Sequence, residues 1–139
     1  MDRAITNQAI AVAGIYVRDQ EEALDFYVGK LGFTIHTDAK SGDYRWLTVQ
    51  LPDQPGFQLG LFRPQPPTVN GATSDLLDEI VAKGAMPPLV MVVDDCRAAN
   101  EILTAKGVEF TQEPISRFGG VDASFRDPSG NGWKLLEAR

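Results

Sequence analysis

Apolar residues recur every three or four positions in the segment 19–33, and this spacing predicts one amphipathic helix. The segment opens with Asp19, whose negative charge is favourable beside the exposed amides of a helix start, and Gly32 marks its end. The apolar run 10–17 comes immediately before it and predicts a strand that leads into the helix. The residues expected on the apolar face of this helix are Ala23, Phe26, Tyr27 and Leu31.

The same order of elements returns in the second half of the chain. An apolar run leads to Asp95, a second amphipathic helix follows, and Gly107 ends it. When Asp95 is aligned with Asp19, the apolar positions of the two helices coincide. The turns PDQPG and DPSGN also fall at equivalent places in the two halves. We interpret this repetition as an internal duplication.

Alternating or apolar stretches predict the remaining strands of each half. They are 33–37, 44–51 and 57–62 in the first half, and 89–93, 108–112, 121–126 and 132–137 in the second. Each half therefore has the order βαβββ. The predicted fold class is α+β, with two tandem βαβββ modules that form a curved mixed sheet around a cleft.

The first module is expected to span residues 1–63 and the second 88–139, and together they make one domain. The linker 64–87 is expected to hold a short helix. Its proline-rich beginning excludes regular structure, so Ser74 is the expected helix cap and Lys83 the last residue. In the second module, 114–120 is expected to be a loop.

The composition is that of a soluble globular protein, with 43% hydrophobic and 23% charged residues. A net charge of −6 argues against nucleic acid or an anionic membrane as a partner. The first residues lack a hydrophobic signal core, which predicts a cytoplasmic protein. Cys96 is the single cysteine, so no internal disulfide forms, and we interpret it as a residue without chemistry at a helix start.

Three segments carry a resemblance to a known superfamily: VRDQEEALDFYVGKLGF, VDDCRAANEILTAKGV and FRDPSGNGWKLLE. They resemble the vicinal oxygen chelate superfamily, which includes glyoxalase I, extradiol dioxygenases and the fosfomycin- and bleomycin-resistance proteins. The resemblance covers residues 10–137 and implies the paired-module fold. It does not by itself imply one activity, because this fold hosts many chemistries.

In the metal-dependent members, the first and last strands of each module supply the metal ligands. The resemblance places these positions at Val12, Gln58, Pro88 and Lys134. One neutral amide and one ammonium are a poor donor set for a divalent cation, and the only histidine, His36, lies on a different strand. We therefore expect no metal and no other cofactor.

Strand alternation predicts which side chains line the cleft. The expected surface is aromatic and partly polar, which is typical of a pocket for a flat organic molecule. Trp46 and Phe62 are alternatively ordinary core residues, and Trp133 is expected in the core, facing the second helix. The predicted ligand-binding residues are Val12, Tyr16, Trp46, Thr48, Gln50, Gln58, Phe62, Ser124 and Lys134, with Asp122 beside them.

Three functions remain open at this point. The first is a metal-free protein that binds or sequesters a small organic ligand, like the bleomycin-resistance members. The second is a glyoxalase- or dioxygenase-type enzyme with non-standard metal ligands. The third is a metal-free enzyme that uses Asp122 or Lys134 as acid or base. The resemblance also implies a homodimer in which two chains share each cleft.

Overall fold

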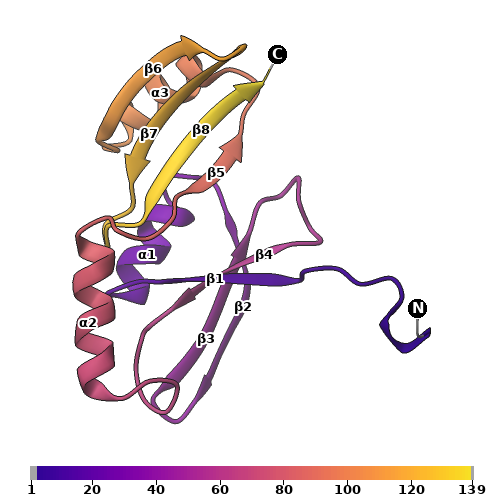
Figure 1. Ribbon diagram of the computed structural model, residues 1–139, viewed down its shortest axis with the longest axis vertical. Helices are drawn as coiled ribbons and strands as arrows, with labels where there is room; N and C mark the ends of the chain where they lie inside the picture. The colour runs from indigo at the N-terminus through magenta and orange to yellow at the C-terminus, as the bar shows by residue number, and fades with distance from the viewer. Residues whose placement is uncertain (1–2, 139) are drawn as a thin grey trace.

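The computed structural model describes residues 3–138 and contains two four-stranded sheets with three α-helices (Figure 1). The first module holds β1 (Val12–Tyr16), α1 (Gln20–Tyr27), β2 (Thr34–Ser41), β3 (Tyr44–Gln50) and β4 (Gln58–Phe62). A short 3₁₀ helix (Arg3–Ile5) precedes it and α2 (Gly71–Ala82) follows it. The second module holds β5 (Leu89–Val92), α3 (Cys96–Ala105), β6 (Phe110–Arg117), β7 (Gly120–Arg126) and β8 (Gly132–Ala138).

The two sheets have the same topology. Sheet A has the strand order β1-β4-β3-β2, and sheet B has the order β5-β8-β7-β6. In each sheet the first strand of the module runs parallel to the last, and the other neighbours are antiparallel. The predicted α+β fold with tandem βαβββ modules is confirmed, and the repeated topology agrees with an internal duplication.

Helix α1 connects the two modules through one continuous core. Its start is capped by Asp19, whose side chain accepts a hydrogen bond from the amide of Glu22. Toward sheet A, the Gln20 amide donates to the carbonyl of Leu61, and toward sheet B the Phe26 ring lies 6.0 Å from that of Phe125. Because this one helix packs against both sheets, the apolar face predicted from its spacing forms the centre of the molecule.

The turn between β7 and β8 forms hydrogen bonds that join the second module to the first. Asp127 accepts a hydrogen bond from the Tyr27 hydroxyl at 2.7 Å, and the Asn131 side chain donates to the Tyr16 carbonyl at 2.8 Å. The Arg18 amide donates to the Ser129 hydroxyl at 2.9 Å. This turn, DPSGN in the sequence, is therefore the polar part of the contact between modules.

Trp133 belongs to the core, as expected, but its ring packs against a different helix from the one predicted. Its centroid lies 5.9 Å from that of Tyr27 in α1, and its indole nitrogen donates to the Tyr27 hydroxyl at 2.9 Å. The expectation followed from strand alternation within one module. It was wrong because α1 of the first module extends over sheet B.

Three predicted boundaries in the chain are wrong. Strand β2 was predicted to end at residue 37 but continues to Ser41, where it is still paired with β3. Helix α2 begins at Gly71, because the Asn70 side chain caps it by accepting from the amide of Thr73. The Ser74 hydroxyl, expected in that role, instead donates to the carbonyl of Pro64. Strand β6 continues through Pro114 to Arg117, because register shifts on both sides of Gln112 keep it paired with β7.

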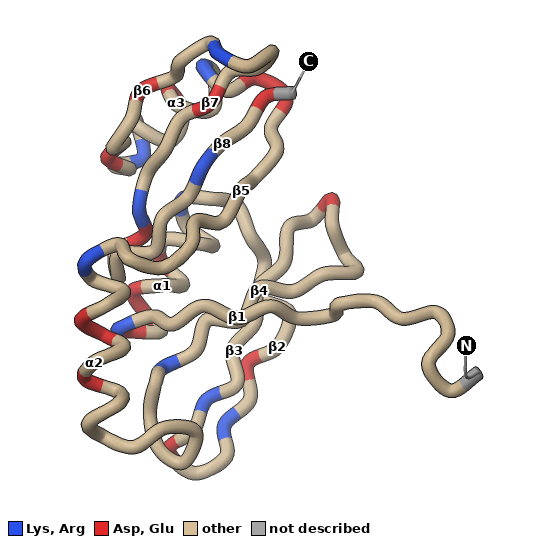
Figure 2. The backbone as a smooth tube through the Cα atoms, in the orientation of Figure 1, with Lys and Arg blue, Asp and Glu red and all other residues tan. Residues whose placement is uncertain are grey.

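The charged residues are unevenly distributed over the two sheets. Strands β1, β4 and β5 contain no charged residue, and Figure 2 shows them in tan along their whole length. The segment before β1 leads away from the body of the molecule, with Ile10 strongly exposed (Figure 1). Within residues 3–138, no helix is both long enough and apolar enough to cross a membrane.

Candidate functional site

The face of sheet A that points away from the core is the first candidate surface. Leu47, Val49, Leu59 and Leu61 fill the core side, so strand alternation places their neighbours on the other side. We call this second side the open face of sheet A. It consists of Val12, Gly14, Tyr16, Trp46, Thr48, Gln50, Gln58, Gly60 and Phe62.

Two paired glycines form a flat recess in the open face of sheet A, and the Phe62 ring lies over it. Gly14 and Gly60 are register partners on β1 and β4. A Cβ atom would lie 2.8 Å from the Phe62 ring at Gly14 and 2.3 Å from it at Gly60, which is closer than side chains approach one another. The absence of side chains at these two positions therefore lets the ring lie against the backbone.

Trp46 extends this aromatic surface. Its ring centroid lies 4.7 Å from that of Phe62, with an angle of 39° between the ring planes. Trp46 is 38% exposed, although burial of a large aromatic side chain stabilises a protein. The Trp46–Phe62 pair thus presents an indole surface to which a planar molecule can stack.

Polar groups lie beside the aromatic pair. The Thr48 hydroxyl donates to the Gln58 side-chain oxygen at 2.7 Å, which leaves the Gln58 amide nitrogen to donate to another molecule. Gln50 has a buried side-chain oxygen without a partner among the described residues. Tyr16, Gly14 and Phe62 also line a recess of about 430 Å³ that continues toward Met86 and Leu89.

In sheet B, Val121, Ala123, Phe125 and Leu135 fill the core side, and we call the opposite side the open face of sheet B. It includes Val90, Val92, Arg117, Asp122, Ser124, Lys134 and Leu136, and it carries a charged cluster. Arg117 donates to both carboxylate oxygens of Asp122, at 3.0 and 2.9 Å, and the Lys134 ammonium donates to Oδ1 at 3.0 Å. The hydrogen bonds from Arg117, followed by the one from Lys134, hold the pKa of Asp122 far below its ordinary value. A carboxylate held in this way is a weak base, which counts against Asp122 as a general base.

The residues at the expected metal positions do not fit a divalent cation. Val12 pairs with Gln58, whose oxygen already accepts from Thr48. Lys134 pairs with Val90, two residues beyond the ligand position Pro88 that the resemblance implied. Val90 has no donor atom in its side chain. In the part of the chain that the structure describes, no three His, Cys, Asp or Glu side chains gather as a metal site would require.

The remaining candidate residues have structural explanations. His36 lies exposed on β2, where its Nδ1 is 2.7 Å from the Thr37 hydroxyl. Cys96 is buried, and burial raises the pKa of its thiol, so the thiolate is disfavoured. Its backbone amide donates to Glu137, which thereby contributes to the start of α3.

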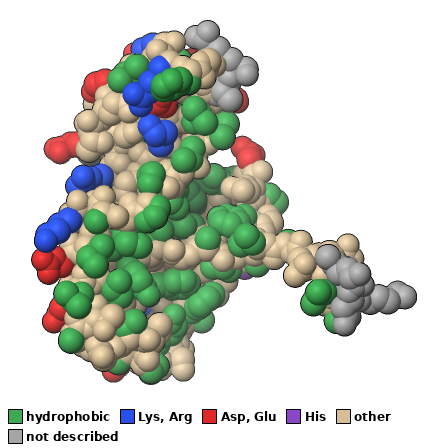
Figure 3. Space-filling model, in the orientation of Figure 1, with side chains coloured by type: hydrophobic (Ala, Val, Ile, Leu, Met, Phe, Trp, Pro, Cys, Tyr) green, Lys and Arg blue, Asp and Glu red, His purple; other side chains and the backbone are tan. Residues whose placement is uncertain are grey.

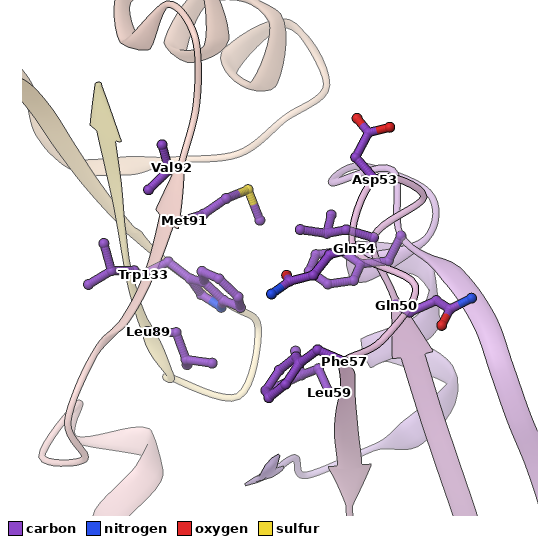
Figure 4. Close-up of a pocket in the computed structure, with 12 residues that line it drawn as sticks. Gln50, Asp53, Gln54, Phe57, Leu59, Leu89, Met91, Val92 and Trp133 are labelled. Atoms are coloured by element: carbon purple, nitrogen blue, oxygen red, sulfur yellow. The ribbon is translucent and has the colours of Figure 1, made fainter. Parts of the chain in front are cut away.

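A larger cavity of about 650 Å³ lies between the two modules (Figure 4). Trp133, Leu89 and Met91 line one side of it, and Phe57 and Gln54 line the other. Of the predicted ligand-binding residues, only Gln50 lines this cavity. The rest of the lining was missed, because the apolar residues of a junction look like core residues in the sequence.

Within one chain, the predicted ligand-binding residues divide into two groups. The larger group lies on sheet A, where Trp46 meets Phe62 and Thr48 meets Gln58. Ser124 and Lys134 are register partners on sheet B. The single cleft expected from the sequence is thus represented by two surfaces on different sheets.

Comparison with known proteins agrees with this architecture. Residues 9–135 match the Glyoxalase/Bleomycin resistance protein/Dioxygenase superfamily. The uncharacterized protein YurT of Bacillus subtilis (strain 168) is 37% identical over 123 residues, which are 88% of this chain and 93% of that protein.

Two solved structures have a similar fold. UcmS2, known from a crystal structure, is 37% identical in sequence to this chain, and the two structures superpose with a TM-score of 0.90. The match covers 96% of this chain and 100% of the UcmS2 chain. TnmS3, an antibiotic binding protein from Streptomyces sp. CB03234, is 27% identical with a TM-score of 0.73 over 94% of this chain and 96% of its own. The sequence match, the repeated modules and these structures lead to one conclusion: the chain belongs to the Glyoxalase/Bleomycin resistance protein/Dioxygenase superfamily.

Proposed function

We propose that this protein binds a flat aromatic, partly polar organic molecule on the open face of sheet A, without a metal ion. The observation that carries the proposal is the half-exposed Trp46 ring paired with Phe62 over the Gly14–Gly60 recess. The Gln58 amide nitrogen beside this pair adds a hydrogen-bond donor. An aromatic surface with a few polar groups is typical of sites that hold small organic molecules.

The similarity to TnmS3 supports this proposal. That protein is described as antibiotic binding, and it aligns with nearly the whole of this chain. Antibiotic binding is therefore a known use of this fold in a protein that is 27% identical to this chain. The low pKa of Asp122 makes the acid–base alternative weaker than binding.

Binding is expected to survive removal of metal ions. After extensive treatment with a chelator, the protein should hold less than about one tenth of an equivalent of any transition metal. It should still bind phenylnaphthylamine, a neutral aromatic fluorophore, saturably and with unchanged affinity, because the proposed contacts are stacking and hydrogen bonds. Elemental analysis and a fluorescence titration measure the two quantities.

Two outcomes would contradict this proposal. If the protein purifies with about one tightly held metal ion per chain and loses probe binding with it, the metal-dependent reading is correct. If the protein, with or without metal, shows no saturable binding of this or other aromatic probes, the open face of sheet A is not a ligand site.

We also propose that the protein is a homodimer in which the open face of sheet A of one chain faces the open face of sheet B of the other. Val90 and Val92 on β5 are 54% and 69% exposed. In the space-filling view, hydrophobic side chains gather across the middle of the molecule, where β1, β4 and β5 lie (Figure 3). A continuous apolar surface of this kind is typical of an interface.

Replacing Val92 by glutamate is expected to convert the dimer to a monomer, because the twofold contact would bury two unpaired carboxylates. Light scattering coupled to size-exclusion chromatography measures the mass. The matched control is Ile102→Glu on α3, which is 58% exposed and lies outside the proposed interface. A monomeric wild-type protein, or an equal effect of the two substitutions, would disprove this arrangement.

A further inference from the structure

The charged cluster on sheet B contains one more positive charge than its own carboxylate neutralises. Arg117 already engages both oxygens of Asp122, at 3.0 and 2.9 Å. Lys134 adds a second cation to the same carboxylate, through a hydrogen bond to Oδ1 at 3.0 Å. An ammonium has three N–H donors, and within residues 3–138 this is the one hydrogen bond that the Lys134 ammonium makes. Charge and donors both remain available at Nζ.

The surroundings of Lys134 favour an ionic interaction with a bound molecule. Its side chain is 33% exposed, so an incoming group can reach it. Its neighbour on β5 is the apolar Val90, and Leu136 follows on the same face of β8. Such apolar neighbours lower the local dielectric constant, and an ion pair formed there is stronger than one in water. Ser124, the register partner on β7, already donates its hydroxyl to Gln112 Oε1 at 3.3 Å, so the donors for a bound anion are those of Lys134.

The remainder of the proposed site cannot supply this positive charge. All residues of the open face of sheet A are uncharged. The chain as a whole carries a net charge of −6, so an anion is repelled by most of its surface. The partly neutralised Lys134 ammonium on the open face of sheet B would therefore make the proposed site selective for an anionic group.

We propose that Lys134 is an anion-binding subsite, and that the ligand is an aromatic molecule with an acidic group such as a carboxylate or sulfonate. The inference rests on the proposed function, because the aromatic part of the ligand occupies the open face of sheet A. In the proposed homodimer, the acidic group meets Lys134 on the facing sheet B. Arg117 is a positioning residue: it shares Asp122 with Lys134, so the carboxylate only partly neutralises the ammonium, which keeps N–H donors for the ligand.

Two fluorophores that differ mainly in one sulfonate test this inference. Anilinonaphthalene sulfonate is anionic, and phenylnaphthylamine is its neutral counterpart. The wild-type protein is expected to bind the anionic probe more tightly. Replacing Lys134 by methionine should lower the affinity for the anionic probe by about tenfold, because one charged hydrogen bond is lost. The affinity for the neutral probe should not change.

Three further variants make the test specific. Lys134→Arg keeps the charge and should retain the preference for the sulfonate. Asp122→Asn removes the competing carboxylate and should strengthen anionic binding several-fold, since both cations are then free. Lys83→Met removes an equal charge from the exposed end of α2 and should change neither probe. Thermal unfolding of each variant confirms that it is folded.

The outcomes separate this inference from the proposed function. Equal binding of both probes by the wild type, or equal effects of Lys134→Met and Lys83→Met on the sulfonate, would overturn the anion subsite and leave aromatic binding intact. Failure of both probes and of every other aromatic compound would overturn the proposed function itself. Loss of the sulfonate preference in Lys134→Met alone, with rescue in Lys134→Arg, is the result that we expect.

Discussion

Replacing Asp127 by alanine is expected to lower the free energy of unfolding by about 3–5 kcal/mol. The carboxylate is 4% exposed and accepts hydrogen bonds from three backbone amides of its own turn, those of Ser129, Gly130 and Asn131. It also accepts from the Tyr27 hydroxyl at 2.7 Å and from the Asn131 side chain at 2.9 Å. Alanine leaves the Tyr27 hydroxyl and the amides of Ser129 and Asn131 without an acceptor inside the protein. The Gly130 amide keeps the backbone carbonyl of residue 127, and the Asn131 side chain keeps the Tyr16 carbonyl.

The Tyr27 hydroxyl increases the loss of stability expected for Asp127→Ala. Tyr27 is fully buried, and its oxygen also accepts a hydrogen bond from the indole nitrogen of Trp133. Burial, together with the charge of Asp127, raises the pKa of Tyr27 well above its ordinary value, so its proton must be donated to a partner. Without Asp127 this donor is orphaned at the centre of the junction between the modules.

Thermal or denaturant unfolding measures the effect, and a fall in melting temperature of about 10–20 °C corresponds to it. The control is Asp53→Ala, since Asp53 lies exposed in the corresponding turn of the first module and should change stability by less than about 0.5 kcal/mol. Tyr27→Phe should cost about 1–3 kcal/mol. If Asp127→Ala is no more destabilising than Asp53→Ala, the turn does not hold the modules together.

The elements that depend on local signals could be predicted from the sequence. Both main helices begin immediately after an aspartate cap, Asp19 or Asp95, and each cap accepts from the amide three residues later. The order βαβββ followed from alternation in the strands and from the repetition of the pattern. These features depend on neighbours in the chain, so one sequence contains enough information to find them.

Features that depend on contacts between distant segments could not be predicted in the same way. Residues 114–120 look like a loop because of Pro114, but pairing with β7 extends β6 to Arg117. That error hid the cation that neutralises Asp122, so the sequence indicated only an Asp122–Lys134 pair. The alternation of Ile115 and Arg117 with their neighbours was the available signal.

The predicted ligand-binding residues were expected on one surface and lie on two sheets. Strand alternation correctly grouped Trp46 with Phe62 and Thr48 with Gln58, because these contacts lie within a single sheet. The relation between sheets A and B is set by α1 and the Asp127 turn, which no local pattern encodes. Only in the proposed homodimer do residues of the two sheets combine in one cleft.

Replacing Trp46 by alanine is expected to weaken the binding of aromatic ligands by about 30-fold. A tryptophan that forms the centre of a binding surface commonly contributes about 2 kcal/mol or more, which corresponds to this factor. Trp46 is 38% exposed and contacts Phe62 on the open face of sheet A. The substitution removes the stacking surface but little of the core, so stability should change by less than about 1 kcal/mol.

Titration with phenylnaphthylamine measures the loss, and Trp46→Phe is expected to retain part of the affinity because a smaller ring still stacks. The matched control is Phe118→Ala in the turn between β6 and β7, where the ring is 99% exposed and does not belong to the open face of sheet A. Both variants lose an exposed aromatic side chain, so any general attraction of the probe to such surfaces should affect them equally. A difference confined to Trp46→Ala would therefore assign binding to the Trp46–Phe62 pair, and equal effects would exclude it.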